Sequence, residues 1–167
     1  MAGRGVTAAL AVLAAASTLV ACGGGEAAGA CSHAERTRAQ FPAGHLLPGQ
    51  PEPTYLSEPP TSGPHAVVVT VPTQVTEPLS RPLQVGLLEL GLVLVQYRPA
   101  DVGPEEVARL EALAGATLLV APNADLPDPV VASAWLSLQR CQDVDTDAIA
   151  RFAEDRASRA PGGHLDG

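Results

Sequence analysis

The stretch LVLVQYRPADVGPEEVARLEALAGATLLVA, residues 92–121, decides the fold. Its first part, residues 92–97, is an apolar and β-branched run stopped by Arg-Pro, which predicts a buried strand. Residues 103–115 begin with Gly-Pro-Glu-Glu and end at a glycine, which predicts a helix with an apolar face. Residues 117–121 predict a second strand. If both strands lie in one sheet, they are parallel and joined by a right-handed crossover.

The flanking segments add further elements. We expect strands over 66–71 and 130–136, and a final helix from Asp145 or Thr146 to about residue 158. Residues 87–90 extend the strand that follows them or form a turn into it, and residues 31–41 form a short helix or turn. The predicted fold class is therefore α/β (α+β): a single domain with a mixed β-sheet, a strand-helix-strand unit, and helices packed mainly on one face.

Composition narrows the function classes. The chain has 167 residues and is 46% hydrophobic but only 3% aromatic, so its core must be built from Val, Leu, Ala and Ile. All ten basic residues are arginine and the net charge is -8. This balance argues against nucleic acid as a partner, because nucleic-acid binding needs a cationic face. It argues equally against electrostatic adhesion to anionic lipid.

The N-terminus predicts the location of the protein. Residues 1–21 resemble a signal peptide, with one arginine before a short apolar run. This run ends in Leu-Val-Ala-Cys, which resembles the lipobox of bacterial lipoproteins, so Cys22 is the expected lipidation site, carrying palmitate or a similar acyl chain. Two acyl chains anchor a protein stably to a membrane. The alternative is an ordinary secretory signal cleaved nearby, with Cys22 a bystander.

These features divide the chain. The lipidated Cys22 begins a small-residue tether over residues 22–30, a globular domain follows over 31–160, and residues 161–167 form a frayed C-terminus. The expected localisation is extracytoplasmic, anchored to the cell membrane through the N-terminal lipid. Two cysteines remain, Cys31 and Cys141, and an oxidising compartment favours a disulfide between them. A buried free thiol or a metal-ligating thiol stays open as an alternative.

Several motifs in order suggest a family. They are His45-Leu46-Leu47-Pro48-Gly49, Pro59-Pro60-Thr61-Ser62-Gly63-Pro64-His65, Glu89-Leu90-Gly91, Gln96-Tyr97-Arg98-Pro99, Val120-Ala121-Pro122-Asn123 and Ala134-Trp135. This series resembles the bacterial family called domain of unknown function 3105, over about residues 31–160. The resemblance implies a signal-bearing or membrane-associated protein and implies no established activity.

The chain departs from the family pattern at one place. Typical members resemble His-Ser-Leu-Glu-His-Gly where this chain has Gly86-Leu87-Leu88-Glu89-Leu90-Gly91, so the His-x-x-Glu-His arrangement is degenerate here. That arrangement resembles zinc-binding spacings. In this chain His45, His65 and Glu89 remain as weak metal-ligand candidates in a two-His-one-carboxylate set. The alternative is that the two histidines bind no metal and instead hold their loops in place by hydrogen bonds to backbone carbonyls. In that case Glu89, if buried, pairs with an arginine such as Arg81 or Arg98.

The sequence carries none of the common catalytic motifs: no G-x-S-x-G, no P-loop, no H-E-x-x-H and no C-x-x-C. We therefore expect a non-catalytic binding or scaffolding module of the bacterial cell envelope, without a cofactor, whose partners are the membrane and an envelope protein. The alternative is a protein that binds zinc or copper through the retained His and Glu residues. A third possibility is a degenerate paralogue that keeps the fold and assists an intact relative.

Overall fold

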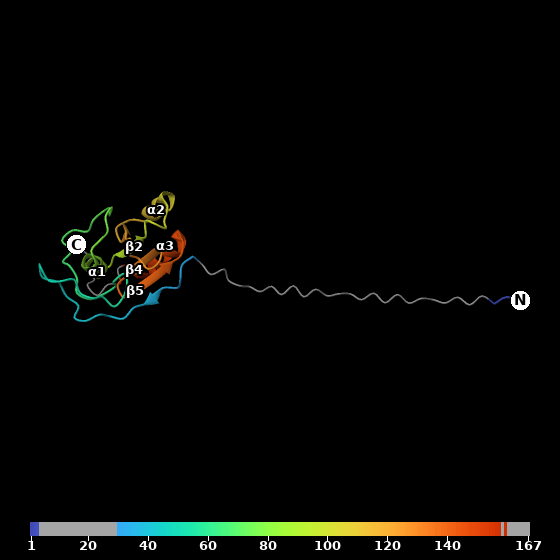
Figure 1. Ribbon diagram of the computed structural model, residues 1–167, viewed down its shortest axis with the longest axis horizontal. Helices are drawn as coiled ribbons and strands as arrows, with labels where there is room; N and C mark the ends of the chain where they lie inside the picture. The colour runs from blue at the N-terminus through green and yellow to red at the C-terminus, as the bar shows by residue number, and fades with distance from the viewer. Residues whose placement is uncertain (4–29, 158, 160–167) are drawn as a thin grey trace.

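The computed structural model describes residues 1–3, 30–157 and 159 (Figure 1). Its centre is a five-stranded sheet of order β1-β5-β4-β2-β3, in which β2 and β3 are parallel and the other pairs antiparallel. The strands are β1 (Glu35–Arg36), β2 (Val93–Tyr97), β3 (Leu118–Pro122), β4 (Val130–Ala134) and β5 (Ser137–Cys141), and the helices are α1 (Arg81–Glu89), α2 (Pro104–Glu111) and α3 (Thr146–Arg156). The predicted single α+β domain with a mixed sheet is confirmed.

The strand-helix-strand unit forms as its sequence predicts. β2 and β3 pair in parallel from Val93 opposite Leu118 to Tyr97 opposite Pro122. The helix between them, α2, begins with proline, which needs no hydrogen-bond partner for its nitrogen at that position. The Glu106 carboxylate accepts a hydrogen bond from the Gly103 N–H at 3.0 Å and so satisfies one of the free donors at the helix start.

Both faces of the sheet are covered. The side chains of Val93 and Val95 pack with Leu110 of α2 and Phe152 of α3 on one face. On the other face, the apolar residues of α1 pack against Leu94 and its neighbours on β2 and β3. Figure 1 accordingly shows α1 on one side of the strands and α3 on the other. Two helices therefore share one face, and the third covers the opposite face.

Helix α1 corrects the expectation for residues 87–90, which do not extend the strand. Residues 87–89 close a helix that begins at Arg81, with Pro82 in its first turn, and only Leu90, with Gly91, forms a turn towards β2. The helix ends because Gly91 adopts a φ of 88°, which a glycine accepts without strain. Every residue from 84 to 88 is buried, so the apolar periodicity that normally reveals a helix is absent from this segment.

Three further expectations are wrong in part. Residues 66–71 form no strand; Ala66 donates its N–H to the Pro82 carbonyl at 3.0 Å, and Val68 and Val71 pack over the α1 face of the sheet. The predicted strand over 130–136 ends at residue 134, and a tight turn leads into β5, which the sequence analysis missed. Residues 31–41 contain the short strand β1 in place of a helix or turn.

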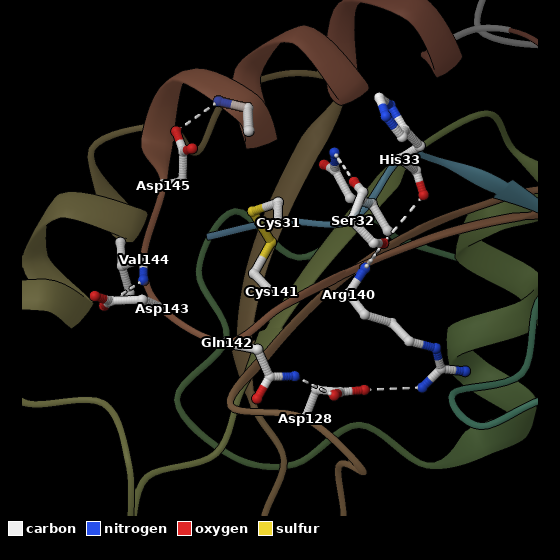
Figure 2. Close-up of a disulfide and its surroundings, with 12 residues drawn as sticks. Cys31, Ser32, His33, Asp128, Arg140, Cys141, Gln142, Asp143, Val144 and Asp145 are labelled. Atoms are coloured by element: carbon white, nitrogen blue, oxygen red, sulfur yellow. Dashed lines mark hydrogen bonds and ion pairs between the residues drawn. A yellow bond between two sulfur atoms is a disulfide. The ribbon is translucent and has the colours of Figure 1, made fainter. Parts of the chain in front are cut away.

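A disulfide joins Cys31 to Cys141, as predicted, across a sequence separation of 110 residues (Figure 2). It fastens the beginning of the domain to the last residue of β5. The Asp145 side chain caps α3 by accepting a hydrogen bond from the Ala148 N–H at 2.9 Å, as the final-helix prediction requires. The predicted signal peptide, Cys22 and the C-terminal residues 161–167 lie outside the described residues. None of the helices within residues 30–157 is both long and apolar enough to cross a membrane.

Candidate metal centre

His45 and His65 lie side by side because their backbones pair. The Leu46 N–H donates to the His65 carbonyl at 2.7 Å, and the His65 N–H donates to the Gly44 carbonyl at 2.9 Å. The centroids of the two imidazole rings are 5.0 Å apart, with the ring planes at 83°. Two chain segments twenty residues apart therefore bring two imidazoles together through main-chain hydrogen bonds, independently of any ion.

The segment that carries His65 is buried and well held. The Ser62 hydroxyl accepts a hydrogen bond from the Gln40 N–H at 3.0 Å, and the Tyr55 hydroxyl donates to the Pro64 carbonyl at 2.7 Å. The His65 side chain itself is only 1% exposed. Residues 59–63 are likewise buried and serve to position His65.

Gly63 fixes the orientation of the His65 ring. Its φ of 116° lies in a region that side chains rarely adopt, and the Gln40 side chain lies 3.0 Å from where a Cβ would stand. The Gly63 carbonyl lies 2.9 Å from His65 Nδ1. A carbonyl oxygen only accepts hydrogen bonds, so Nδ1 carries a proton, and Nε2 is the ring nitrogen that faces Glu89.

Glu89 reaches the histidines from the last residue of α1. Gly86, one turn earlier, lets the helix approach the residue after His65: a Cβ on Gly86 would lie 2.5 Å from the Ala66 carbonyl oxygen and 2.9 Å from Val68 Cγ2. The carboxylate also lies at the negative end of the helix dipole, which favours a cation there. Gly86 is thus the residue that permits the contact between α1 and the His65 segment.

The three side chains converge. Glu89 Oε2 lies 2.6 Å from His65 Nε2 and 3.9 Å from His45 Nε2. One ligand atom from each residue lies within 4.8 Å of the other two. Despite its short distance to the carboxylate, the buried Nε2 of His65 has no hydrogen-bond partner of acceptable geometry. The two atoms are thus within ion-pair distance without meeting the geometry of a hydrogen bond, and they would have to move slightly apart to bind one ion together.

The donor set fits a transition-metal ion. Metal–nitrogen and metal–oxygen bonds in zinc sites are about 2.0–2.2 Å long, so two ligands of one ion lie at most about 4 Å apart. The most distant pair must therefore approach by less than about 1 Å. His45, whose side chain is 58% exposed, is the ligand with room to move, whereas His65 is fixed by burial. The exposed side of His45 leaves coordination positions open to water or another ligand.

The arginines proposed as partners for Glu89 are engaged elsewhere. Arg81 pairs with Glu58 at 2.6 Å and stacks over Tyr55, 5.1 Å from the ring centroid. Arg98 pairs with Asp101. Burial raises the pKa of the Tyr55 phenol to about 12, with the Glu52 charge adding to the effect and Arg81 opposing it. These contacts tie the first turn of α1 to the loop that carries His65, so both ends of the helix are fixed against that loop.

The fold and the site define a small α+β domain with a candidate two-His-one-carboxylate centre. The family model described as "Protein of unknown function (DUF3105)" matches residues 50–165, which include His65 and Glu89 but not His45. The chain belongs to this family, as the sequence resemblance indicated. No curated protein matches the chain, and no solved structure matches it.

Proposed function

We propose that this protein binds a transition-metal ion through His45, His65 and Glu89 at the outer surface of the cell membrane, to which the lipid on Cys22 anchors it. The convergence of the three side chains carries the metal-binding part of the proposal. It moves the metal-binding alternative ahead of the scaffolding role that the sequence first favoured. The protein holds and presents the ion and does not itself catalyse a reaction.

The chemistry of the donors selects the ion. Imidazole nitrogen and carboxylate oxygen suit Zn²⁺ and Cu²⁺, whereas Cu⁺ prefers thiolate and thioether sulfur. The only methionine is Met1, and the two cysteines within residues 30–157 are joined in the disulfide. Sulfur therefore does not contribute to the site within the described chain. Zn²⁺ and Cu²⁺ are the ions to test, and Cu²⁺ should bind more tightly.

Isothermal titration calorimetry of the full-length protein in a neutral detergent tests the site. We expect one Zn²⁺ or Cu²⁺ per chain, and a loss of binding in His65→Ala and in Glu89→Gln. Glu89→Gln keeps the shape of the side chain and removes the charge, so it separates ligation from packing. His33→Ala is the matched control, because His33 is exposed and outside the cluster. Equal affinity in His33→Ala and His65→Ala would refute the site.

The anchor is tested separately. Metabolic labelling with a radioactive fatty acid should label the wild type and leave Cys22→Ala unlabelled, with the variant released from the membrane fraction. The observation that supports this expectation is the Leu-Val-Ala-Cys run after the signal-like leader. A Cys22→Ala variant that remains labelled and membrane-bound would disprove the anchor and leave the metal site untouched.

A further inference from the structure

A second polar site shares no residue with the histidine cluster. A pocket of about 260 Å³ is lined by Arg36 of β1, by Trp135 and Leu136 of the turn between β4 and β5, by Arg156 at the end of α3, and by Arg159 beyond that helix. Three separate segments, at residue 36, residues 135–136 and residues 156–159, thus contribute side chains to one small cavity.

The charges of this pocket are unbalanced. Among the residues that the structure describes, its lining contains three arginines and no acidic residue, although the whole chain has a net charge of -8. Among residues 30–157 and 159, the ion pairs of arginine involve Arg81, Arg98, Arg109 and Arg140, and none of the three pocket arginines takes part in one. Neighbouring guanidinium groups repel one another unless an anion lies between them.

One pocket arginine is also unsatisfied. The Nε of Arg156 is shielded from solvent and has no hydrogen-bond partner in the described part of the chain. The negative end of the α3 dipole explains a single cation at the end of the helix. It does not explain why Arg36, from a strand next to β5, faces the same cavity, or why a buried donor is left without an acceptor.

The turn that forms the wall of the pocket is strained. β4 ends at residue 134 and β5 begins at 137, so Trp135 and Leu136 form a two-residue turn, and Leu136 adopts a φ of 56°. A leucine rarely adopts this conformation, and glycine or asparagine usually takes its place in such turns. Backbone strain of this kind is found preferentially at functional sites. There a side chain that the site needs is kept although its backbone conformation is unfavourable. Here the turn places an aromatic and an aliphatic side chain beside the arginines.

We infer that this pocket binds a small anionic ligand through a phosphate or carboxylate group. Planar guanidinium groups form paired hydrogen bonds to either oxyanion, and the buried Arg156 Nε supplies a donor that such a group would satisfy. The Trp135 ring provides an apolar wall for the rest of the ligand. This site shares no residue with the histidine cluster and does not depend on metal binding.

Tryptophan fluorescence tests the inference, because Trp135 is the only tryptophan in the chain. The metal-free, full-length protein in neutral detergent is titrated with inorganic phosphate and, separately, with acetate, at constant ionic strength maintained with sodium chloride. We expect a saturable change in Trp135 emission with at least one anion. A response to phosphate alone assigns a phosphate group, and a response to acetate alone assigns a carboxylate.

Two variants and a control define the site. Arg156→Gln and Arg36→Gln should each weaken the response at least tenfold, and Arg151→Gln, an exposed position on the same helix, should leave it unchanged. Arg36 is exposed, so Arg36→Gln reports on binding even if Arg156→Gln lowers stability; thermal unfolding is measured for each variant. The proposal is overturned if chloride alone reproduces the emission change, if neither anion changes it, or if Arg36→Gln responds like the wild type.

Discussion

Gly86→Ala is the substitution that most directly tests how the fold builds the histidine cluster. The added Cβ would lie 2.5 Å from the Ala66 carbonyl oxygen, whereas close carbon–oxygen contacts are about 3.3–3.6 Å. The helix and the segment after His65 must therefore separate by about 1 Å. Overpacking of this kind costs about 1–3 kcal/mol, and the better helix propensity of alanine offsets up to about 1 kcal/mol. The free energy of unfolding should fall by about 0–2 kcal/mol.

The effect on the site should exceed the effect on stability. Glu89 follows Gly86 by one helical turn, and His65 immediately precedes Ala66, so the separation acts on the 2.6 Å contact between Glu89 Oε2 and His65 Nε2. Metal–ligand distances tolerate deviations of only about 0.2 Å. A displacement of about 1 Å exceeds this tolerance and should change the Zn²⁺ affinity by roughly tenfold or more, which corresponds to about 1.4 kcal/mol. Calorimetry measures the affinity, and guanidinium denaturation measures the stability.

Gly115→Ala is the matched control, because no atom lies within 4 Å of a Cβ at that position. It should leave Zn²⁺ affinity unchanged. The chemical shifts of the His65 imidazole protons in the metal-free protein give a second measure, since they should change in Gly86→Ala and stay as in wild type in the control. A Gly86→Ala protein with unaltered His65 shifts and unaltered Zn²⁺ affinity would refute the argument that close helix approach builds the site.

Three further predictions address the fold and the site. Replacing Cys31 and Cys141 by alanine should lower the free energy of unfolding by up to about 5 kcal/mol, which is the chain-entropy value for closing a loop of 110 residues. In guanidinium denaturation, a reductant should destabilise the wild type but not this variant. Leu90→His should tighten Zn²⁺ binding by roughly tenfold or more, because position 90 follows Gly86 by four residues on the same helix face and can add a fourth ligand; an unchanged calorimetric affinity would contradict this placement. Burial raises the pKa of Tyr55 to about 12 and also raises the pKa of Tyr97, so neither of the two tyrosines should be half-ionised at pH 10 in the native protein. The stabilisation from the Tyr55 proton should be complete below pH 10 and lost as the pH rises through 12. Absorbance at 295 nm in native and urea-unfolded protein checks both expectations.

The elements that could be predicted are those whose signals are local. The unit from β2 to β3 has a proline and two acids at the helix start, a glycine after the helix, and compact apolar strands on both sides. Helix α1 escaped prediction because residues 84–88 are buried all round and present no polar face. β5 escaped because Ser137-Leu138-Gln139-Arg140-Cys141 is largely polar, and its polar side chains bond to distant segments, as when Gln139 donates to the Ser32 carbonyl at 3.0 Å.

The site residues were accessible to sequence reasoning only as candidates. A family resemblance drew attention to His45, His65 and Glu89, but their convergence depends on contacts that no local pattern encodes. The two histidines meet through a backbone pair between distant loops, and the glutamate arrives from a helix that the sequence did not reveal. The arginine pocket left no signal at all, because Arg36 and Arg156 are 120 positions apart and look like ordinary surface charges in the sequence.

Gly86 also bears on whether this chain is a degraded member of its family. The pattern that the sequence resemblance implies has histidine at the position of Gly86, yet here even a methyl group at that position would meet the Ala66 carbonyl oxygen at 2.5 Å. The space that a histidine would need is occupied by the chain segment directly after His65. The absence of a side chain at position 86 therefore permits the close packing that sets His65 Nε2 against Glu89. A site that had merely decayed would leave a gap there, whereas this packing favours an alternative cluster with its own ligands over an inactive relative that only keeps the fold.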